Sequence, residues 1–139
     1  MAEPLAGDEA RKGCNMASTD INSERAQRFL DGLPFGALLG AVLGPVAPGR
    51  VEMSMPHGPD IALGKDLNVT HPGAITALID TCAGAAVITH PDAGPVTATI
   101  DLRVDHLRTA SANATVYATA ECYAVAHSCL LYTSDAADD

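Results

Sequence analysis

Three polar residues in the middle of the chain, Asn68, His71 and Asp80, have side chains that could take part in chemistry. Pro72 and Gly73 follow His71 at the start of a long run of small and apolar residues. The start of a helix offers unpaired N–H groups and the positive end of the helix dipole, and both favour a developing oxyanion. A carboxylate two turns further along can hold a water molecule or attack a carbonyl carbon itself. A helix start with polar residues beside it and a carboxylate further along therefore make this region the candidate functional site.

The run that carries Asp80 predicts a helix over Gly73–Thr89. One face repeats large apolar side chains at helical spacing: Ile75, Leu78, Ile79, Cys82, Ala86 and Val87. A second face is made of small residues, which let another part of the chain approach closely: Thr76, Ala77, Ala83 and Gly84, together with Asp80. Such a helix is buried nearly all round. A carboxylate within it therefore needs a reason, and chemistry is one.

The elements around this helix are predicted from alternation and turn signals. Four strands are predicted: Gly40–Ala47, followed by a turn signal at Pro48-Gly49, and three segments in which apolar and polar residues alternate, Arg50–Met55, Val96–His106 and Ala112–Val125. A short helix is expected over Asp20–Asp31 and a loop over Pro56–Asp66. The order is helix, two strands, long helix, then strands in hairpin order. This order indicates an α+β fold in which one helix packs on an antiparallel sheet.

The segment N-x-x-H-x-G-x-x-x-x-L-x-D, from Asn68 to Asp80, resembles the signature of hotdog-fold acyl-CoA thioesterases of the phenylacetate-degradation (PaaI-like) family. Downstream, ATIDLRVDHLRTA (Ala98–Ala110) resembles a strand of that family, which usually ends closer to FLRPA. The resemblance covers about Phe35 to Ser128. It implies a long central helix wrapped by a curved antiparallel sheet. It also implies homodimers or homotetramers with active sites at the subunit interface.

The resemblance also implies roles for single residues. Asp80 matches the acid that acts as general base or nucleophile in thioester hydrolysis. Asn68 and His71 match the polar residues beside it, and Gly73 lies among the amides that hold the thioester carbonyl. Thr99 falls where a hydroxyl group from the partner subunit helps to position water.

One residue departs from the family pattern. The family usually has Gly-Gly after the histidine, and the N–H of the first glycine is the oxyanion donor. Pro72 stands at that position here, and proline has no N–H. The donor must then shift to Gly73 or Ala74, or be absent. Loss of one such donor costs about 100- to 1,000-fold in rate.

The candidate residues also have simpler structural interpretations. Asp80 could form an ion pair with Arg103 or Arg108 instead of doing chemistry. The others have local alternatives: a helix cap for His71, a turn for Asn68 and an ordinary strand position for Thr99. His106 is expected to be a satisfied core or interface histidine.

The leading hypothesis is hydrolysis of an acyl-CoA to the free acid and coenzyme A. No cofactor is expected, because coenzyme A is part of the substrate. Arg108 could contact the phosphates of coenzyme A, although a solvated arginine at a strand end fits equally well. Two other hypotheses stay open: a non-catalytic hotdog module that binds acyl-CoA or another acyl ligand, and a hydratase or dehydratase that acts on acyl thioesters. Nothing in the sequence selects the acyl group.

Composition excludes several other functions. The formal net charge is -9 with only 8 Lys and Arg residues, so no nucleic-acid partner is expected. The 4 cysteines form no C-x-x-C pair, so no metal site is expected. We find no signal peptide and no run of apolar residues long enough to span a membrane. These features predict a cytoplasmic protein.

The two ends of the chain differ from its middle. Residues 1–18 are expected to be disordered, and either Met1 or Met16 could be the true start. Residues 19–128 form the expected domain. Residues 129–139 read CLLYTSDAADD, which resembles a translated sequencing adapter, since one codon choice reproduces a transposase-end adapter. We therefore expect a non-native tail after Ser128 and a sheet that lacks its last strand or strands; the alternative is an ordinary acidic tail.

Overall fold

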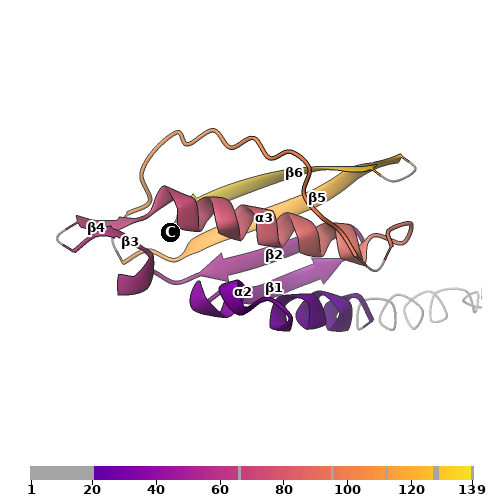
Figure 1. The fold of residues 1–139 in the computed structure, drawn as a ribbon, viewed down its shortest axis with the longest axis horizontal. Coiled ribbons are helices and arrows are strands. Elements are labelled where there is room, and N and C mark those ends of the chain that lie inside the picture. Colours follow the sequence, from indigo (N-terminus) through magenta and orange to yellow (C-terminus); the bar gives the residue numbers. More distant parts are fainter. Residues whose placement is uncertain (1–20, 66, 95, 112, 127–128, 139) are drawn as a thin grey trace, which may run out of the picture.

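The protein was analysed as a computed structural model, which describes residues 21–65, 67–94, 96–111, 113–126 and 129–138. The expected disorder of residues 1–18 and the choice between Met1 and Met16 lie outside these residues. Within them, one long helix lies against an antiparallel sheet, and shorter helices cover one side of it (Figure 1). This is the α+β arrangement that the sequence predicts.

Helix α3, Pro72–Thr89, is the centre of the fold and begins one residue earlier than predicted. Most of its second half is buried, as the pattern of large and small residues indicates. By length and mean hydropathy (1.4) α3 could cross a membrane, but 56% of that stretch is buried inside the fold. The core helix of a soluble protein passes the same test, so this feature is weak evidence for a membrane span.

The main sheet has the strand order β1-β2-β5-β6, with every neighbouring pair antiparallel. Its strands are β1 (Val42–Ala47), β2 (Arg50–Met55), β5 (Val116–Ala126) and β6 (Cys129–Asp138). Gly49 forms the turn between β1 and β2 with φ +72°, a conformation that glycine adopts without strain. β5 begins later than the predicted strand over Ala112–Val125. Helix α3 packs across β2, β5 and β6.

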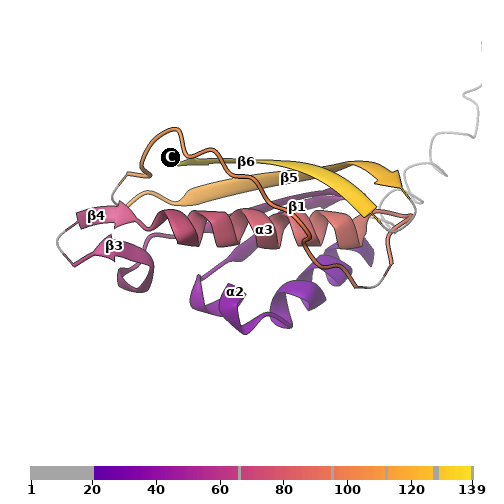
Figure 2. The same ribbon diagram turned by 45° about the horizontal axis from the view of Figure 1, so that its top comes forward.

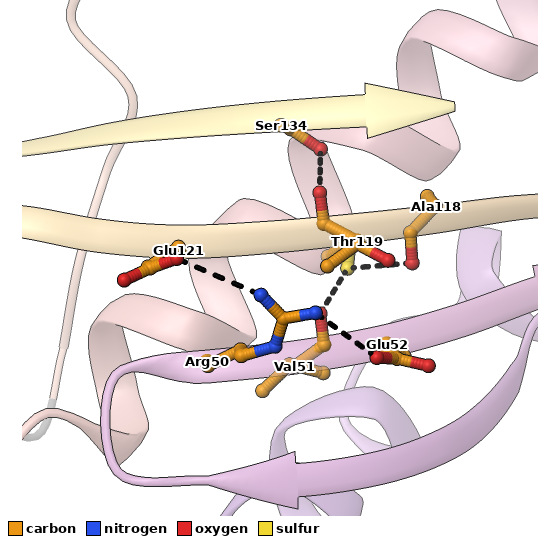
Figure 3. A network of polar contacts seen from close by, with 8 residues as sticks. Arg50, Val51, Glu52, Ala118, Thr119, Glu121 and Ser134 are labelled. Atoms are coloured by element: carbon orange, nitrogen blue, oxygen red, sulfur yellow. Dashed lines mark hydrogen bonds and ion pairs between the residues drawn. The ribbon is translucent and has the colours of Figure 1, made fainter. Parts of the chain in front are cut away.

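The outer face of the sheet carries charged side chains that face solvent. Arg50 lies opposite Glu121 in the β2–β5 ladder. Its guanidinium group lies 3.2 Å from Glu52 and 3.6 Å from Glu121 (Figure 3). All three side chains are exposed, so these ion pairs contribute little stability. Their position shows which face of β2 is turned away from α3.

The hydrophobic core lies between the sheet and α3. Val51, Met53 and Met55 of β2 alternate inward, as the sequence predicts, and are at most 1% exposed. Leu78 and Cys82 of α3 face them and are fully buried. Small alanines on β5 let the helix lie close to the sheet: Ala118 and Ala120. The core thus holds α3 in one position, and with it Asp80.

Replacing Leu78 with alanine is expected to lower the free energy of unfolding by about 2–5 kcal/mol. Leu78 is 0% exposed at the centre of the contact between α3 and the sheet, so the truncation leaves a cavity. Urea unfolding followed by circular dichroism measures this loss. The exposed Leu38, which is 61% exposed, provides the control, and its replacement by alanine should change stability far less. A small loss for Leu78→Ala would mean that the core collapses around the gap.

Two helical segments lie alongside α3, next to β1 (Figures 1 and 2). Residues 21–31 are helical, in agreement with the prediction for the part of Asp20–Asp31 that the structure describes. Helix α2 follows over Pro34–Leu38. The ring of Phe29 lies against Gly84 of α3, where a Cβ atom would come within 3.0 Å of the ring. The small-residue face of α3 therefore receives a side chain from the first helical segment.

The loop predicted over Pro56–Asp66 is partly wrong. It contains a 3-10 helix, Pro59–Ile61, and strand β3, Ala62–Gly64. β3 pairs antiparallel with β4, Leu67–Thr70, in a second, two-stranded sheet at the start of α3. β3 is too short for an alternating pattern to be recognised in the sequence.

The strand predicted over Val96–His106 is also wrong. The described residues of the range 96–111 take an irregular path that passes over α3 (Figure 2). This segment belongs to neither sheet of the described residues, and it lines cavities of about 330 and 280 Å³ together with β6. Alternation identifies residues that fit a strand, but a strand also needs a partner edge.

The expectation that the sheet stops after Ser128 is wrong for the described residues. Cys129–Asp138 form β6, which pairs with β5 along its whole length, with one irregularity near Cys122. Tyr132, Ser134 and Ala136 are partly buried, whereas the residues between them are exposed. Backbone pairing needs only N–H and C=O groups, so an unusual side-chain sequence can still complete a ladder. The adapter origin of this segment stays a prediction.

Candidate active site

Asp80 and Thr99 form the most direct polar contact in the candidate site. The Thr99 hydroxyl group donates a hydrogen bond of 2.7 Å to Oδ1 of Asp80. Asp80 projects from the middle of α3 and is half-buried, while Thr99 belongs to the irregular segment that crosses the helix. The resemblance implied that Thr99 would come from a partner subunit. In this structure the two side chains meet within one chain.

His71 caps the start of α3. It has an extended backbone (φ −62°, ψ 129°), and its Nδ1 atom accepts a hydrogen bond of 2.9 Å from the N–H of Gly73. Its backbone carbonyl accepts a second bond of 2.9 Å from the N–H of Ala74. Pro72 at the first helical position has no N–H. The first three amides of α3 are thus absent or engaged, so an oxyanion must displace the His71 ring to reach Gly73.

The helix start and the carboxylate are separate parts of the site. Gly73 and Asp80 are seven residues apart in α3, which corresponds to about 10 Å along the helix axis. A nucleophile must lie about 3–3.5 Å from the carbon that it attacks. A carbonyl group held at Gly73 is therefore out of reach of Asp80 in the same chain. Within one chain, the predicted residues form two half-sites.

The remaining predicted residues lie around these two half-sites. Asn68 belongs to β4, just before His71, and its side chain lies outside the described part of the structure. Arg108 lines the cavity of about 330 Å³ beside Ile75 and Ile79 of α3. His106 is exposed and its Nε2 atom lies 3.3 Å from Thr76 Oγ1, so it is hydrogen-bonded but is not a core residue.

The ion pairing considered for Asp80 does not include Arg103. The guanidinium group of Arg103 lies 3.3 Å from Asp105 on the same segment. Asp80 instead accepts a hydrogen bond from the Thr99 hydroxyl group. This geometry favours the chemical interpretation of Asp80 over the ion pair with Arg103.

Tyr132 of β6 is a neighbour of the site that the sequence did not predict. Its hydroxyl group is buried and lies near the Thr99 side chain, but among the described residues it makes no hydrogen bond of regular geometry. Burial raises the pKa of Tyr132, interaction with the Thr99 side chain lowers it, and the negative charges of Asp80 and Asp101 raise it; the net shift is upward. The hydroxyl group is thus neutral and close to the Asp80–Thr99 pair. It lies in the segment expected to be a non-native tail, so no motif could have identified it.

Cys82 is a second potential nucleophile on α3, and its environment makes it inert. Its thiol donates to the carbonyl groups of Val51 at 3.3 Å and Ala118 at 3.5 Å, both of which Figure 3 shows. Burial raises the pKa of Cys82 from 9.0 to about 12. Because the thiolate is the reactive form, the chemistry of the site does not depend on this cysteine.

Alkylation of Cys82 by iodoacetamide at pH 8 is expected to be about 1,000-fold slower than that of an ordinary thiol, in proportion to its thiolate fraction. Mass spectrometry of the peptide that contains Cys82 measures the modification over time. The same protein unfolded in guanidinium chloride serves as the control and should react at the ordinary rate. Equal rates in the folded and unfolded chain would show that Cys82 is accessible.

The described residues contain no group of three or more His, Cys, Asp or Glu side chains that could hold a metal ion.

The sequence and the fold of this chain are similar to those of known proteins. A family model described as the thioesterase superfamily matches residues 67–134. A solved structure of a protein from Pseudomonas aeruginosa is 31% identical, covers 84% of this chain and 86% of its own chain, and has a TM-score of 0.74. No curated protein sequence matches.

Two more distant structures share the fold. A thioesterase family protein from Silicibacter pomeroyi is 23% identical, with 83% of this chain and 82% of that chain covered and a TM-score of 0.73. The PaaI protein from the phenylacetic acid degradation operon of E. coli is 18% identical, with 86% and 83% covered and a TM-score of 0.75.

Proposed function

Because the chain belongs to the thioesterase superfamily, we propose that it hydrolyses an acyl-CoA thioester with Asp80 as general base or nucleophile. Family membership supports thioester hydrolysis in general. The fold is the hotdog fold, with a central helix wrapped by an antiparallel sheet, as the sequence resemblance implied. The substrate and the residue roles are the parts that we propose.

The hydrogen bond from Thr99 to Asp80 is the observation that carries the proposal. It fixes one carboxylate oxygen and leaves the other to take a proton from water. Water, activated in this way, adds to the carbonyl carbon of the thioester, and the carbon–sulfur bond then breaks. The coenzyme A thiolate leaves and takes up a proton, and the acid is released. In the alternative route, Asp80 attacks the carbonyl carbon directly and water cleaves the resulting anhydride.

We further propose that the reacting centre combines half-sites from two copies of the chain. One copy supplies the helix start with His71 and Gly73, and the other supplies Asp80 and Thr99. The separation of about 10 Å along α3 requires this arrangement if both half-sites act on one carbonyl group. The segment that carries Thr99 exposes large apolar side chains, which a second copy would cover: Val96 (84%), Ile100 (87%) and Leu107 (94% exposed). A homodimer, or a tetramer built from it, accounts for both features.

Ile100→Asp is expected to convert the dimer into a monomer and to abolish hydrolysis in parallel. A charge placed among apolar residues that a partner covers must be desolvated, which disfavours association. Size-exclusion chromatography with light scattering gives the mass, and thiol release gives the rate. Ile21→Asp is the matched control, since Ile21 is 59% exposed on a different element. A monomeric variant that retains full activity would show that one chain is sufficient.

The proposed substrate is an acyl-CoA in the cytoplasm. Arg108 lines the cavity beside α3 and is a candidate for contact with the phosphates of coenzyme A. The chain carries a net charge of -9, so local positive groups must attract an anionic substrate. Arg103 lines the same cavity.

The direct test is the release of free coenzyme A from a panel of acyl-CoAs, from acetyl to dodecanoyl and including phenylacetyl. Saturable turnover supports hydrolysis. The alternative function is a non-catalytic module that binds acyl-CoA, and it is favoured by the engaged amides of Gly73 and Ala74 and by Pro72. Saturable binding in calorimetry without any turnover across the panel would favour that alternative.

A further inference from the structure

A mainly apolar pocket lies beside the start of α3, next to the half-site of His71 and Gly73. Its volume is about 380 Å³. Its walls come from α2, from the 3-10 helix and β3, and from the first turn of α3: Phe35, Leu38, Leu39, Asp60, Ile61, Ala62, His71, Gly73 and Ala74. Figure 2 shows that α2 and β3 lie on the same side of α3. The pocket is thus built from segments that are far apart in the sequence.

Two of these residues are exposed in a way that folding alone does not explain. Phe35 is 56% exposed and Leu38 is 61% exposed, and they lie on one face of α2 at a spacing of three residues. Leu39 beside them is only 4% exposed and anchors α2 to the core. Apolar side chains that are held in place but open to solvent commonly mark a binding site.

The position of α2 is fixed by its ends. Pro34 occupies the first helical turn, which suits its fixed φ angle. The N–H of Leu39 donates to the carbonyl of Phe35, and Gly40 then turns the chain with φ +64°. The N–H of Ala41 donates to the carbonyl of Gly36. Phe35 and Leu38 are therefore presented by a closed turn, which makes them a preformed wall.

We propose that this pocket binds the acyl group of the substrate, as an unbranched chain of medium length or an aryl group, and that Phe35 and Leu38 set its preferred length. This proposal rests on the proposed thioester hydrolysis. A thioester carbonyl at the Gly73 amide would direct its acyl group into the adjoining pocket. The volume lies near the lower end of the range of about 300–1,000 Å³ that is usual for ligand pockets. Asp60 on the wall disfavours acyl groups with a second carboxylate.

The first experiment measures binding without turnover. The chain contains no tryptophan, so Leu38→Trp introduces a single reporter at the pocket. Its fluorescence is titrated with 1-alkanols from butanol to dodecanol, which are neutral and are therefore not repelled by Asp60. We expect a saturable change whose affinity rises about fourfold for each methylene group and then levels off when the pocket is full. Ile21→Trp, at an exposed position that does not line the pocket, should show no such change.

The second experiment measures specificity. Leu38→Ala should flatten the rise of kcat/KM with acyl length in hydrolysis of the acyl-CoA series, and Ile21→Ala should leave the series unchanged. Equal responses of the two tryptophan variants, or no dependence on alkanol length, would overturn the pocket assignment. A Leu38→Trp signal that changes with protein concentration but not with alkanol concentration would also overturn the assignment, because a second copy of the chain would then cover this surface. Binding of alkanols without hydrolysis by any variant would leave the pocket in place and reject the proposed reaction.

Discussion

Asp80→Asn is expected to lower kcat for acyl-CoA hydrolysis by about 100- to 10,000-fold, the usual contribution of general acid–base catalysis. Asparagine has nearly the same shape and can still accept the hydrogen bond from Thr99, so α3 and its surroundings should be preserved. It cannot take a proton from water or act as a carboxylate nucleophile. The change removes an interaction made in the transition state, so kcat and kcat/KM should fall together. Steady-state kinetics by thiol release measures both.

Two variants of the segment that crosses α3 separate chemistry from position. Asp101→Asn is the matched control, because Asp101 is an exposed carboxylate close to Thr99 in sequence and should not affect kcat. Thr99→Val keeps the carboxylate but removes its hydrogen bond, so its kcat should fall less than that of Asp80→Asn. If Asp80→Asn hydrolyses acyl-CoA at the parental rate, Asp80 is a structural acid and the proposed mechanism is wrong.

Periodicity was sufficient to predict the elements that form the core. The α3 pattern places Leu78 and Cys82 on one face, and the β2 pattern places Val51 and Met53 on one side. The apolar faces of α3 and β2 pack against each other. The apolar positions in each sequence pattern are therefore the side chains that are buried. These elements also carry Asp80, and for this reason the helical position of the acid followed from the sequence.

Pairing partners were not predictable in the same way. Residues 96–106 alternate well, but the structure places them in an irregular segment and not in a sheet, because a strand also depends on pairing with a neighbouring strand. The opposite error concerns β6. Its residues show no alternating pattern, yet the strand pairs with β5. Backbone hydrogen bonding has little dependence on side chains, so alternation alone overestimates one segment and underestimates the other.

In the candidate site, too, local features were predictable and contacts between distant segments were not. The motif identified Asp80, His71 and Gly73, because their spacing is local to one helix and its cap. The contact between Asp80 and Thr99 spans two elements and needed the structure. The hydrogen bond between the Gly73 amide and the His71 ring was also visible only in the structure. The sequence does not distinguish a capping histidine from an open oxyanion site, because both use the same amide donor.

Pro72→Ala is expected to raise kcat by up to about 100- to 1,000-fold, the rate lost when one oxyanion donor is absent. Pro72 is the first residue of α3, and an amide placed there has no partner within the helix. Alanine restores that N–H and is a good helix former. The Gly73 amide can then stay bonded to the His71 ring while the new amide binds the carbonyl oxygen. Loss of the proline ring should cost only about 0.4–1 kcal/mol in stability.

Pro72→Gly distinguishes the restored amide from a change in backbone freedom. Both variants regain the N–H, so both should show the increase in kcat if the donor is limiting. An increase for Pro72→Gly alone would point instead to a helix start that must move during the reaction, because glycine loosens the first turn. Parental rates for both variants would show that this position is not where the carbonyl oxygen binds. If acyl-CoA still bound without turnover in both variants and across the whole panel, the chain would be a binding module and Asp80 a structural carboxylate on its central helix.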